Sequence, residues 1–372
     1  MAGTLMVAAG GGGDAITAAA LARIVPAAGP PVIMTYAWDR LMIDPLPGPR
    51  TAAQFTGLRH LAPHLWQVLP STTPTPPAGS SLPRLAAELP ATLLLLDPEN
   101  GAAGMTDQIR AAATHFGADE VALVDVGGDS LTNGQDPGLR SPLADQLALA
   151  ACAQAGLPAR LLIAAPGIDG EIPPETILDR LLTLGASQLP SLTETDITPV
   201  RHIFSWHPSE ASGLLAAAAS GHRGLVEVRD AGDQVNLAAE TTSLYAADAE
   251  ATLEITPARL LTGTSSLAQA ETLISDATGI SEIRYETEKS HRLKGRRVHH
   301  PTPADLPAVD QHAREADTRG ARYISTRRLA ELLHASTPGT FTELCHLLAA
   351  ERPHHYEPSI YRTTPRWQRP AQ

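Results

Sequence analysis

Short apolar runs alternate with Ala- and Leu-rich helical stretches from the first residues of the chain to about residue 206. The apolar runs predict strands at Thr4–Ala9, Val32–Tyr36, Ala91–Leu96, Val121–Val126, Arg160–Ala165 and His202–Trp206. The helical stretches between them lie near Ala15–Ile24, Met105–Phe116, Ala144–Ala155 and Glu175–Leu184. Because strands that alternate with helices are typical of a parallel sheet covered on both faces, the pattern predicts a doubly wound, mostly parallel α/β fold.

The alternation loosens after about residue 210. Strands are predicted at Gly224–Arg229 and Ile283–Glu286, and helices at Ser265–Thr278, Ala304–Ala316, Thr326–Leu333 and Phe341–Ala350. The end of the chain, from Arg352, is rich in Pro, Arg and His. We therefore expect a ligand-binding domain over residues 1–210, a smaller α+β region packed on it over residues 211–350, and a flexible tail over residues 351–372.

Composition narrows the class of protein. The chain has 372 residues, 43% of them hydrophobic, which is enough for a large core. Its formal net charge of -12, without a basic stretch interleaved with aromatic residues, argues against nucleic-acid binding. The apolar runs are too short to span a bilayer, and the N-terminus lacks the basic segment of a signal peptide. We therefore expect a cytoplasmic protein without a membrane segment, and homo-oligomerisation stays open.

Cysteine and lysine usage excludes two kinds of site. Cys152 and Cys345 lie far apart in separate apolar helical patterns, which is typical of buried free thiols in a reducing compartment. Lysine occurs only at Lys289 and Lys294. A P-loop needs a lysine directly after its glycines, and a Schiff base needs a lysine in the site, so neither chemistry is expected.

A glycine-rich loop follows the first predicted strand and opens the first helix. Its sequence is Gly10-Gly11-Gly12-Gly13-Asp14, and Gly10, Gly12 and Ala15 satisfy the pattern G-x-G-x-x-A. Because free amides at a helix start bind anions, the loop predicts a Rossmann-like phosphate site, with Asp39 placed as a ribose-binding acid. A carboxylate at Asp14 would repel a pyrophosphate. Asp14 can instead cap the helix, bind a sugar hydroxyl or hold a metal. The alternative for the whole loop is a tight turn with an ordinary Asp cap and no ligand.

A second polar loop follows the strand at Val121–Val126. Asp125 and Asp129 are separated by two glycines, which makes an oxygen-rich turn of the kind that Mg²⁺, Ca²⁺ or a ribose diol prefers. The alternative is a structural turn in which the Asp side chain bonds its own backbone. Ser141 and Pro142 then read as an N-cap and first helical position, which would bring Asp145 close to this loop.

Further polar residues follow other predicted strands. Asp97 follows Ala91–Leu96, Asp169 and Glu171 follow Arg160–Ala165, and His207, Ser209 and Glu210 follow His202–Trp206. In an open parallel sheet the carboxyl ends of all strands lie on one edge, where ligands bind. We therefore expect these groups to face one crevice. Arg50 or Arg140 is placed to neutralise a phosphate or carboxylate there, although both also suit plain surface ion pairs.

Several of these motifs together resemble one known family. They are the glycine loop ending in Asp14, Trp38 with Asp44-Pro45 and Pro47-Gly48-Pro49-Arg50, Val124–Asp129, Gly138–Asp145, Asp169-Gly170-Glu171 and His207-Pro208-Ser209-Glu210. The chain resembles the DUF1152 family of archaea and actinobacteria over most of its length. That family has no assigned activity, so the resemblance implies one shared site without naming a reaction. Gln135 stands where the family pattern leads us to expect an acid, which makes it a poor catalytic candidate.

Three functions fit these features. The first is a transferase or hydrolase that acts on a nucleoside, nucleotide or phosphosugar by glycosyl or phosphoryl chemistry with Mg²⁺ or Ca²⁺. In that hypothesis Asp169, His207 and Glu210 are catalytic, Asp125, Asp129 and Asp145 hold the metal, and Gly10, Gly11, Gly12, Gly13, Asp14, Asp39, Arg50, Arg140 and Ser141 bind the phosphorylated or ribose-containing ligand. The alternatives are an NAD(P)-dependent oxidoreductase and a non-catalytic protein that senses a metabolite or binds a partner.

Overall fold

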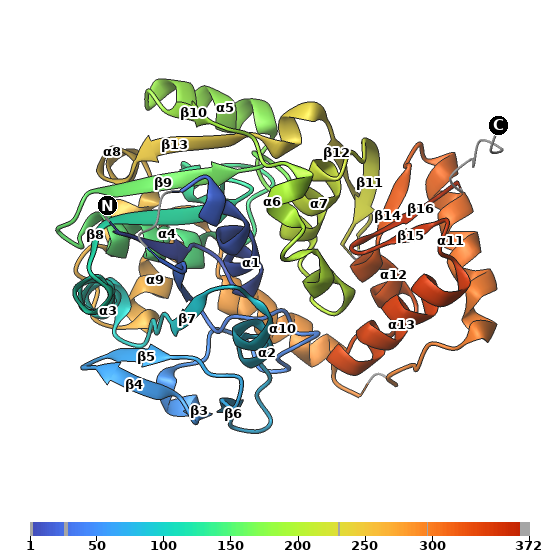
Figure 1. The fold of residues 1–372 in the computed structure, drawn as a ribbon, viewed down its shortest axis with the longest axis horizontal. Helices are drawn as coiled ribbons and strands as arrows, with labels where there is room; N and C mark the ends of the chain where they lie inside the picture. The colour runs from blue at the N-terminus through green and yellow to red at the C-terminus, as the bar shows by residue number, and fades with distance from the viewer. Residues whose placement is uncertain (1–2, 26–28, 230, 296, 365–372) are drawn as a thin grey trace.

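Five parallel strands form the centre of the larger sheet in the computed structural model, which describes residues 3–25, 29–229, 231–295 and 297–364 (Figure 1). They are β1 (Gly3–Ala8), β2 (Val32–Thr35), β7 (Thr92–Leu95), β8 (Ala118–Val126) and β9 (Ala159–Ala164). Their order across the sheet is β7-β2-β1-β8-β9, which corresponds to strands 3-2-1-4-5 of the Rossmann order 3-2-1-4-5-6. The predicted mostly parallel, Rossmann-like α/β fold is confirmed.

Antiparallel strands extend this sheet to nine on both edges within the described ranges. On one side β13 (Leu244–Asp248) pairs with β9, and β10 (Ser187–Leu189) pairs with β13. On the other side β5 (Leu65–Gln67) pairs with β7, and β4 (Arg59–Ala62) pairs with β5. A separate ribbon joins β3 (Phe55–Thr56) to β6 (Thr73–Pro74).

Helices bury both faces of the central strands. In β1, Leu5 and Val7 belong to one apolar cluster while Met6 and Ala8 belong to another, as the two-residue period of a strand requires. The first cluster is covered by α3 (Gly101–Phe116), α4 (Pro142–Ala153), α5 (Pro174–Thr183), α8 (Ala249–Ile255) and α9 (Leu267–Thr278). The second is covered by α1 (Gly12–Ala20), α2 (Leu82–Glu88), α6 (Glu194–Ile197) and α7 (Glu210–Ala219). Burial on both faces explains why the strands are continuous apolar runs in the sequence.

A smaller sheet of five strands follows on the far side of α7 (Figure 1). Its order is β12 (Asp233–Leu237), β11 (Gly224–Val228), β14 (Tyr323–Ser325), β16 (Ile360–Arg362) and β15 (Tyr356–Glu357). Val226 and Ile360 pack into the same core as α1 and α7. On the other face, Ile324 and Tyr361 share a third core with α11 (Leu306–Thr318), α12 (Thr326–Leu332) and α13 (Pro338–Glu351). This sheet and its helices form the smaller α+β region.

Short 3-10 helices complete the chain, together with α10 (Glu282–Leu293). They are η1 (Leu21–Arg23), η2 (Ala52–Gln54), η3 (Asp129–Leu131), η4 (Arg201–Ser205), η5 (Ala239–Thr242), η6 (Pro257–Leu261) and η7 (Pro303–Asp305). No helix within the described ranges is both long and apolar enough to cross a membrane.

Two predicted strands are wrong. The segment His202–Trp206 falls on η4, where the amides of Ile203 and Trp206 donate to carbonyls three residues earlier, as in a 3-10 helix. The segment Ile283–Glu286 falls in α10, whose N-cap Ser281 accepts a hydrogen bond from the Arg284 amide.

The chain divides differently from the expected ranges. The boundary expected at residue 210 falls at the start of α7, and the later segment returns β13 to the larger sheet. The expected tail of residues 351–372 contains β15 and β16, which pair with each other and with β14. Residues 365–372 of that tail lie outside the described residues.

Glu227 of β11 joins two helices of the smaller region to its sheet. The side chain is 1% exposed and lies 2.7 Å from Arg319 and 3.2 Å from Arg328. Burial raises the pKa of Glu227. The hydrogen bond and charge of Arg319 and the charge of Arg328 lower it by more, so the pKa lies below its usual value. The carboxylate is therefore ionised and shared between two arginines.

Replacing this carboxylate tests its role in the smaller region. We expect Glu227→Ala to lower the free energy of unfolding by roughly 3 kcal/mol, because removing one partner of a buried ion pair leaves the other desolvated. The pKa of Glu227 is lower in the folded than in the unfolded protein. The loss of unfolding free energy in the variant is therefore full at a pH above the usual pKa of a glutamate, and it disappears as the pH falls through the folded pKa. Urea unfolding measures it, with Asp107→Ala, in an exposed pair with Arg110, as the control. Equal stability of the two variants would contradict this role.

Candidate functional site

A pocket of about 470 Å³ lies at the point where the strand order reverses, between β1 and β8. The loops after these two strands lead to opposite faces of the sheet, and ligands bind in such crevices. All of the predicted site residues except Arg50 line it: Gly10, Gly11, Gly12, Gly13, Asp14, Asp39, Asp125, Asp129, Arg140, Ser141, Asp145, Asp169, His207 and Glu210. Elements distant in the sequence therefore meet here, as the shared sheet edge led us to expect.

The glycine loop closes tightly on its neighbours. The Asp14 carboxylate accepts a hydrogen bond from the Gly10 amide at 3.0 Å, across the mouth of the loop. A methyl group on the next three glycines would overlap with the Trp38 carbonyl oxygen, the Ser81 hydroxyl and the Ser209 hydroxyl, in that order. The amides of Gly11–Gly13 donate to no acceptor within the described residues. The glycines are thus needed for packing, while their amides stay available to a ligand.

Asp125 organises the loop that carries it. One carboxylate oxygen accepts from the Gly128 amide at 3.0 Å, and the other accepts from the amide of Ser130 at 2.9 Å and from its hydroxyl. Both oxygens are therefore bonded to the residue's own turn. The geometry is that of the structural Asp turn, the alternative to a metal ligand at this position.

Asp129 and Asp169 form a carboxyl pair at the floor of the pocket. Their side chains lie within hydrogen-bonding reach, and Asp169 packs so closely over Gly127 that a methyl group there would overlap with its carboxylate. Burial and then the charge of Glu171 raise the pKa of Asp169 to about 7. Burial and the charge of Asp169 raise the pKa of Asp129 well above its usual value. Two carboxylates this close cannot both ionise cheaply, so the pair retains a proton near neutral pH.

Three further acids line the same space. Burial, followed by the charge of Asp125, raises the pKa of both Asp14 and Asp145 well above the usual value. Burial and the charge of Glu286 raise the pKa of Glu282 to about 8. These shifts share one cause: carboxylates are desolvated beside one another, which disfavours their charged forms.

Glu171 occupies the N-terminus of α4. It accepts hydrogen bonds from the amides of Arg140 at 2.7 Å and Ser141 at 3.1 Å, and from the Ser141 hydroxyl at 2.8 Å. Arg229 adds an ion pair at 3.3 Å. Ser141 does precede the helix, with Pro142 first, but its side chain serves Glu171 and does not cap α4. This helix N-terminus is therefore filled by protein carboxylate, and Arg140 points its guanidinium to Asp233 at 3.1 Å.

His207 is a neutral hydrogen-bond donor in this setting. Its Nδ1 accepts a hydrogen bond from the Ser209 amide at 3.3 Å, which places the remaining proton on Nε2. The Nε2 atom is buried without a partner among the described residues. Burial lowers the pKa of His207 to about 3. An imidazole that stays neutral to such acidity is poorly suited to the predicted role of proton-transfer group and well suited to donating a hydrogen bond.

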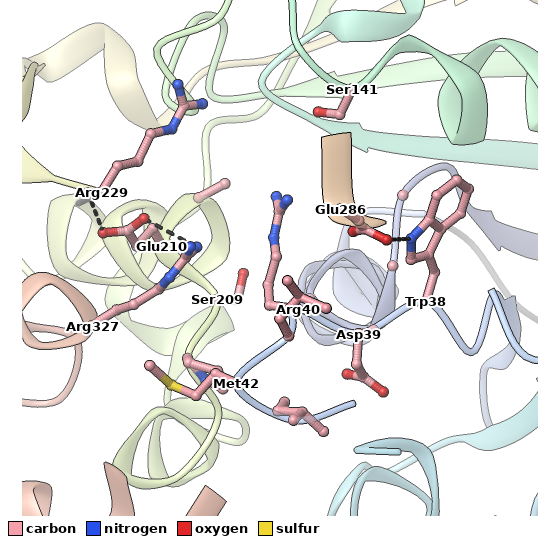
Figure 2. A pocket seen from close by; sticks show the side chains of 18 of the residues that line it. Trp38, Asp39, Arg40, Met42, Ser141, Ser209, Glu210, Arg229, Glu286 and Arg327 are labelled. Atoms are coloured by element: carbon pink, nitrogen blue, oxygen red, sulfur yellow. Dashed lines mark hydrogen bonds and ion pairs between the residues drawn. The ribbon is translucent and has the colours of Figure 1, made fainter. Parts of the chain in front are cut away.

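Glu210 binds neighbouring protein groups on the opposite wall (Figure 2). It pairs with Arg327 at 3.2 Å, and it accepts hydrogen bonds from the Arg229 amide at 2.9 Å and the Ser325 hydroxyl at 2.5 Å. These bonds tie α7 to the smaller region at the pocket. A catalytic role for Glu210, as predicted, would require its carboxylate to leave these partners.

Two predicted ligand-binding residues have structural partners. Asp39 accepts hydrogen bonds from the Ser81 amide at 2.9 Å and hydroxyl at 2.6 Å, so both oxygens hold the start of α2. Arg50 is buried, pairs with Asp44 at 3.0 Å and donates to the carbonyls of Leu46, Pro47 and Gly48. It lies outside the pocket, because its charge is needed to hold its own turn. We correct the prediction that Arg50 neutralises a ligand.

Several pocket residues were missed by the sequence analysis. Glu286 accepts hydrogen bonds from the Trp38 ring at 3.0 Å and the Gly48 amide at 2.8 Å (Figure 2). Arg40, also drawn there, is exposed and lies close enough to lower the pKa of Asp14 and Glu282. Reading α10 as a helix would have found part of this set, because Glu282 and Glu286 are four residues apart and share a buried face.

The acidic floor is not arranged as a ready-made metal cage. In the parts of the chain that the structure describes, no group of three or more His, Cys, Asp or Glu side chains is placed to hold a metal ion. One buried oxygen of Asp129 lacks a hydrogen-bond partner among these residues. Of the three predicted metal ligands, Asp129 is therefore the one with an available buried oxygen.

A pocket at the strand-order reversal of a mostly parallel sheet defines a Rossmann-like α/β protein with a ligand site. The chain belongs to the DUF1152 family, described as a protein of unknown function, whose model matches residues 5–290. That match covers the larger sheet, the acidic floor and most of α10. No curated protein and no solved structure matches the chain.

The crowding of carboxylates predicts an unusual dependence of stability on pH. The folded pKa of Glu282, about 8, exceeds the usual value of a glutamate in the unfolded chain, so the folded protein binds more protons between these two pKa values. The destabilisation of the folded state by ionised Glu282 therefore grows as the pH rises toward 8. We expect Glu282→Gln, which keeps an acceptor for the Leu143 amide, to raise the melting temperature by about 2 °C or more near pH 8.

Differential scanning calorimetry from about pH 4 to about pH 8 measures this difference, which should vanish at the acidic end. Asp107→Asn, at an exposed position, is the control and should change little at either pH. A Glu282→Gln variant less stable than the wild type at the alkaline end would contradict the crowding.

The close approach of Asp169 to Gly127 gives a second prediction. Gly127→Ala should destabilise the fold by roughly 1–3 kcal/mol, because the new methyl group displaces the carboxyl pair. Gly221→Ala is the control, since Gly221 also has a φ well beyond the left-handed helical region, 91° against 126°, but faces open space. Urea unfolding should separate the two variants, and equal losses would show that backbone strain alone is responsible.

Proposed function

We propose that this chain is an enzyme that uses Asp129 and Asp169 as a general acid–base pair on a nucleoside, nucleotide or phosphosugar-type ligand. The supporting observation is the close pair of buried carboxyl groups, in which burial and the charge of Glu171 raise the pKa of Asp169 to about 7. Proton-transfer groups work best when their pKa lies near the working pH, and perturbed carboxyl pairs in clefts are typical of such sites.

The proposed chemistry is transfer or hydrolysis at a glycosyl or phosphoryl centre. The protonated member of the pair gives its proton to the leaving oxygen, and the ionised member takes the proton of the attacking hydroxyl or water. A contact pair acts from one side of the reacting bond, unlike glycosidase carboxylates, which stand about 5 Å or more apart on opposite sides. The remaining floor acids would accept hydrogen bonds from sugar hydroxyls.

A divalent cation remains part of the proposal in a specific form. Mg²⁺ is commonly held by one or two carboxylates together with substrate phosphates, without a cage made of protein alone. The free oxygen of Asp129 suits such an ion. We therefore propose that Mg²⁺ or Ca²⁺ arrives with the phosphorylated ligand, with Asp145 nearby and Asp125 supporting the loop.

Two lesser proposals accompany this function. An NAD(P) site is less favoured, because the acid expected to bind ribose, Asp39, is bonded to Ser81. A cytoplasmic location is favoured because Cys152 and Cys345 are free, buried thiols, which suits a reducing compartment.

A thermal-shift panel tests the ligand class. Nucleosides, nucleotides, sugar phosphates and NAD(P)(H) are each measured with Mg²⁺ and with EDTA, because binding to the folded state raises the melting temperature. A Mg²⁺-dependent shift with a nucleotide or sugar phosphate supports the proposal. A shift with NAD(P) that ignores EDTA would favour an oxidoreductase, and no shift with any ligand would favour a partner-binding protein.

Asp169→Asn tests the catalytic pair with whichever ligand the enzyme consumes. We expect the variant to bind that ligand but to turn it over at least roughly 100-fold more slowly, because general acid–base catalysis contributes about that much. The pH–rate profile of the wild type should show an inflection near the pKa of about 7. Asp107→Asn serves as the control. Wild-type turnover by Asp169→Asn would overturn the assignment.

A further inference from the structure

We infer that the first turn of α1, Ser209 and His207 form a seat for one tetrahedral oxyanion, the phosphate ester group of the ligand. The inference rests on the proposed function and names the anionic part of that ligand. It assigns His207 a binding role in place of proton transfer.

The N-termini of α1 and α7 meet at this place. Ser209, the residue before α7, lies against Gly13 so closely that a methyl group on that glycine would overlap with its hydroxyl. The Ser212 hydroxyl in the first turn of α7 donates to the Gly13 carbonyl at 2.7 Å and holds the two helices together. The positive ends of two helix dipoles are thus close to one point, which favours an anion there.

Hydrogen-bond donors at this point lack acceptors. The amides of Gly11–Gly13 donate to nothing within the described ranges, and neither does the Ser209 hydroxyl, which does not cap α7. Figure 2 shows the Ser209 side chain directed into the pocket. A phosphate offers enough oxygens to satisfy several of these donors at once.

His207 supplies the independent observation. It lines the same pocket, is 5% exposed, and has a buried Nε2 without a partner among the described residues. Its Nδ1 is held by the Ser209 amide, so the ring is fixed beside the seat with its proton on Nε2. A buried donor left without an acceptor destabilises the folded protein, and a ligand oxygen that accepts from it would remove that penalty.

The local charges are compatible with an anion. Arg40 is the exposed cation whose charge acts on Asp14 at the mouth of the loop. Because burial and the charge of Asp125 raise the pKa of Asp14, the charged form of that side chain is disfavoured. This weakens the repulsion between Asp14 and an anion bound at the glycine loop.

Anion titration with variants of the seat tests the inference. Isothermal titration calorimetry of inorganic phosphate and of sulfate is carried out on wild type, His207→Phe and Ser209→Ala. We expect both anions to bind the wild type, with Kd weakened roughly 10-fold in His207→Phe and several-fold in Ser209→Ala, because each loses a donor. Because burial lowers the pKa of His207 to about 3, the ring stays neutral between about pH 5 and pH 8, and the ratio of sulfate Kd between His207→Phe and the wild type should stay constant over that range.

Ser205→Ala is the matched control, because that exposed hydroxyl bonds to the His202 carbonyl at 2.7 Å outside the pocket. The seat is overturned if the wild type binds neither anion, or if both variants bind as tightly as the control. A sugar phosphate that binds more tightly than inorganic phosphate and competes with it identifies an ester as the ligand. Phosphate bound without such a gain for any ester would contradict the ester assignment and point to free phosphate.

Asp169→Asn separates this inference from the proposed function. It should bind phosphate like the wild type while losing turnover. If Asp169→Asn loses turnover while His207→Phe and Ser209→Ala bind phosphate as tightly as the wild type, the seat alone is overturned. Phosphate binding at the seat with full turnover in Asp169→Asn would overturn the acid–base pair alone.

Discussion

Carboxylates crowd together at the edge of the larger sheet, where little water remains to stabilise their charges. Asp14, Asp125, Asp129, Asp145, Asp169 and Glu282 line one pocket, and acidic side chains there outnumber arginines and lysines. Such groups lower their energy by keeping protons, by accepting hydrogen bonds from amides, or by binding a cation. Asp125 is stabilised by its own turn and Glu171 by the N-terminus of α4, whereas burial and neighbouring charges raise the pKa of Asp129 and Asp169. The proposed acid–base pair thus consists of acids whose charged forms are disfavoured.

The smaller region contributes to the same electrostatic arrangement. Arg229, at the end of β11, pairs with Glu171, and Arg327 of α12 pairs with Glu210. The charge of Glu171, which Arg229 pairs with, contributes to the raised pKa of Asp169. Residues of both sheets therefore line one pocket, and a sequence boundary at residue 210 separates residues that lie together in space.

The sequence was sufficient to predict the parallel core and the sheet edge at which the pocket lies. Buried strands are continuous apolar runs, and the parallel arrangement carries the residues that follow them to one edge, so Asp129 and Asp169 were placed there without knowing any contact. His207 does line the pocket, but the segment before it is η4 and not the predicted strand. Their roles could not be derived. Whether a carboxylate binds a ligand or a neighbour depends on contacts distant in the chain, such as Ser81 with Asp39, while Arg50 is held by its own turn. The polar helix α10 was missed because its buried face consists of Glu282 and Glu286, which carry no apolar signal.

The shared proton of Asp129 and Asp169 is the claim on which the proposed chemistry depends most directly. Carbon-13 NMR of aspartate-labelled protein, with the two carboxyl signals assigned by Asp129→Asn and Asp169→Asn, follows their ionisation in the ligand-free state. We expect the pair to hold a proton near pH 6 and to release it with an apparent pKa of about 7. Complete ionisation of both carboxyl groups below about pH 5, in the range of ordinary aspartates, would contradict it.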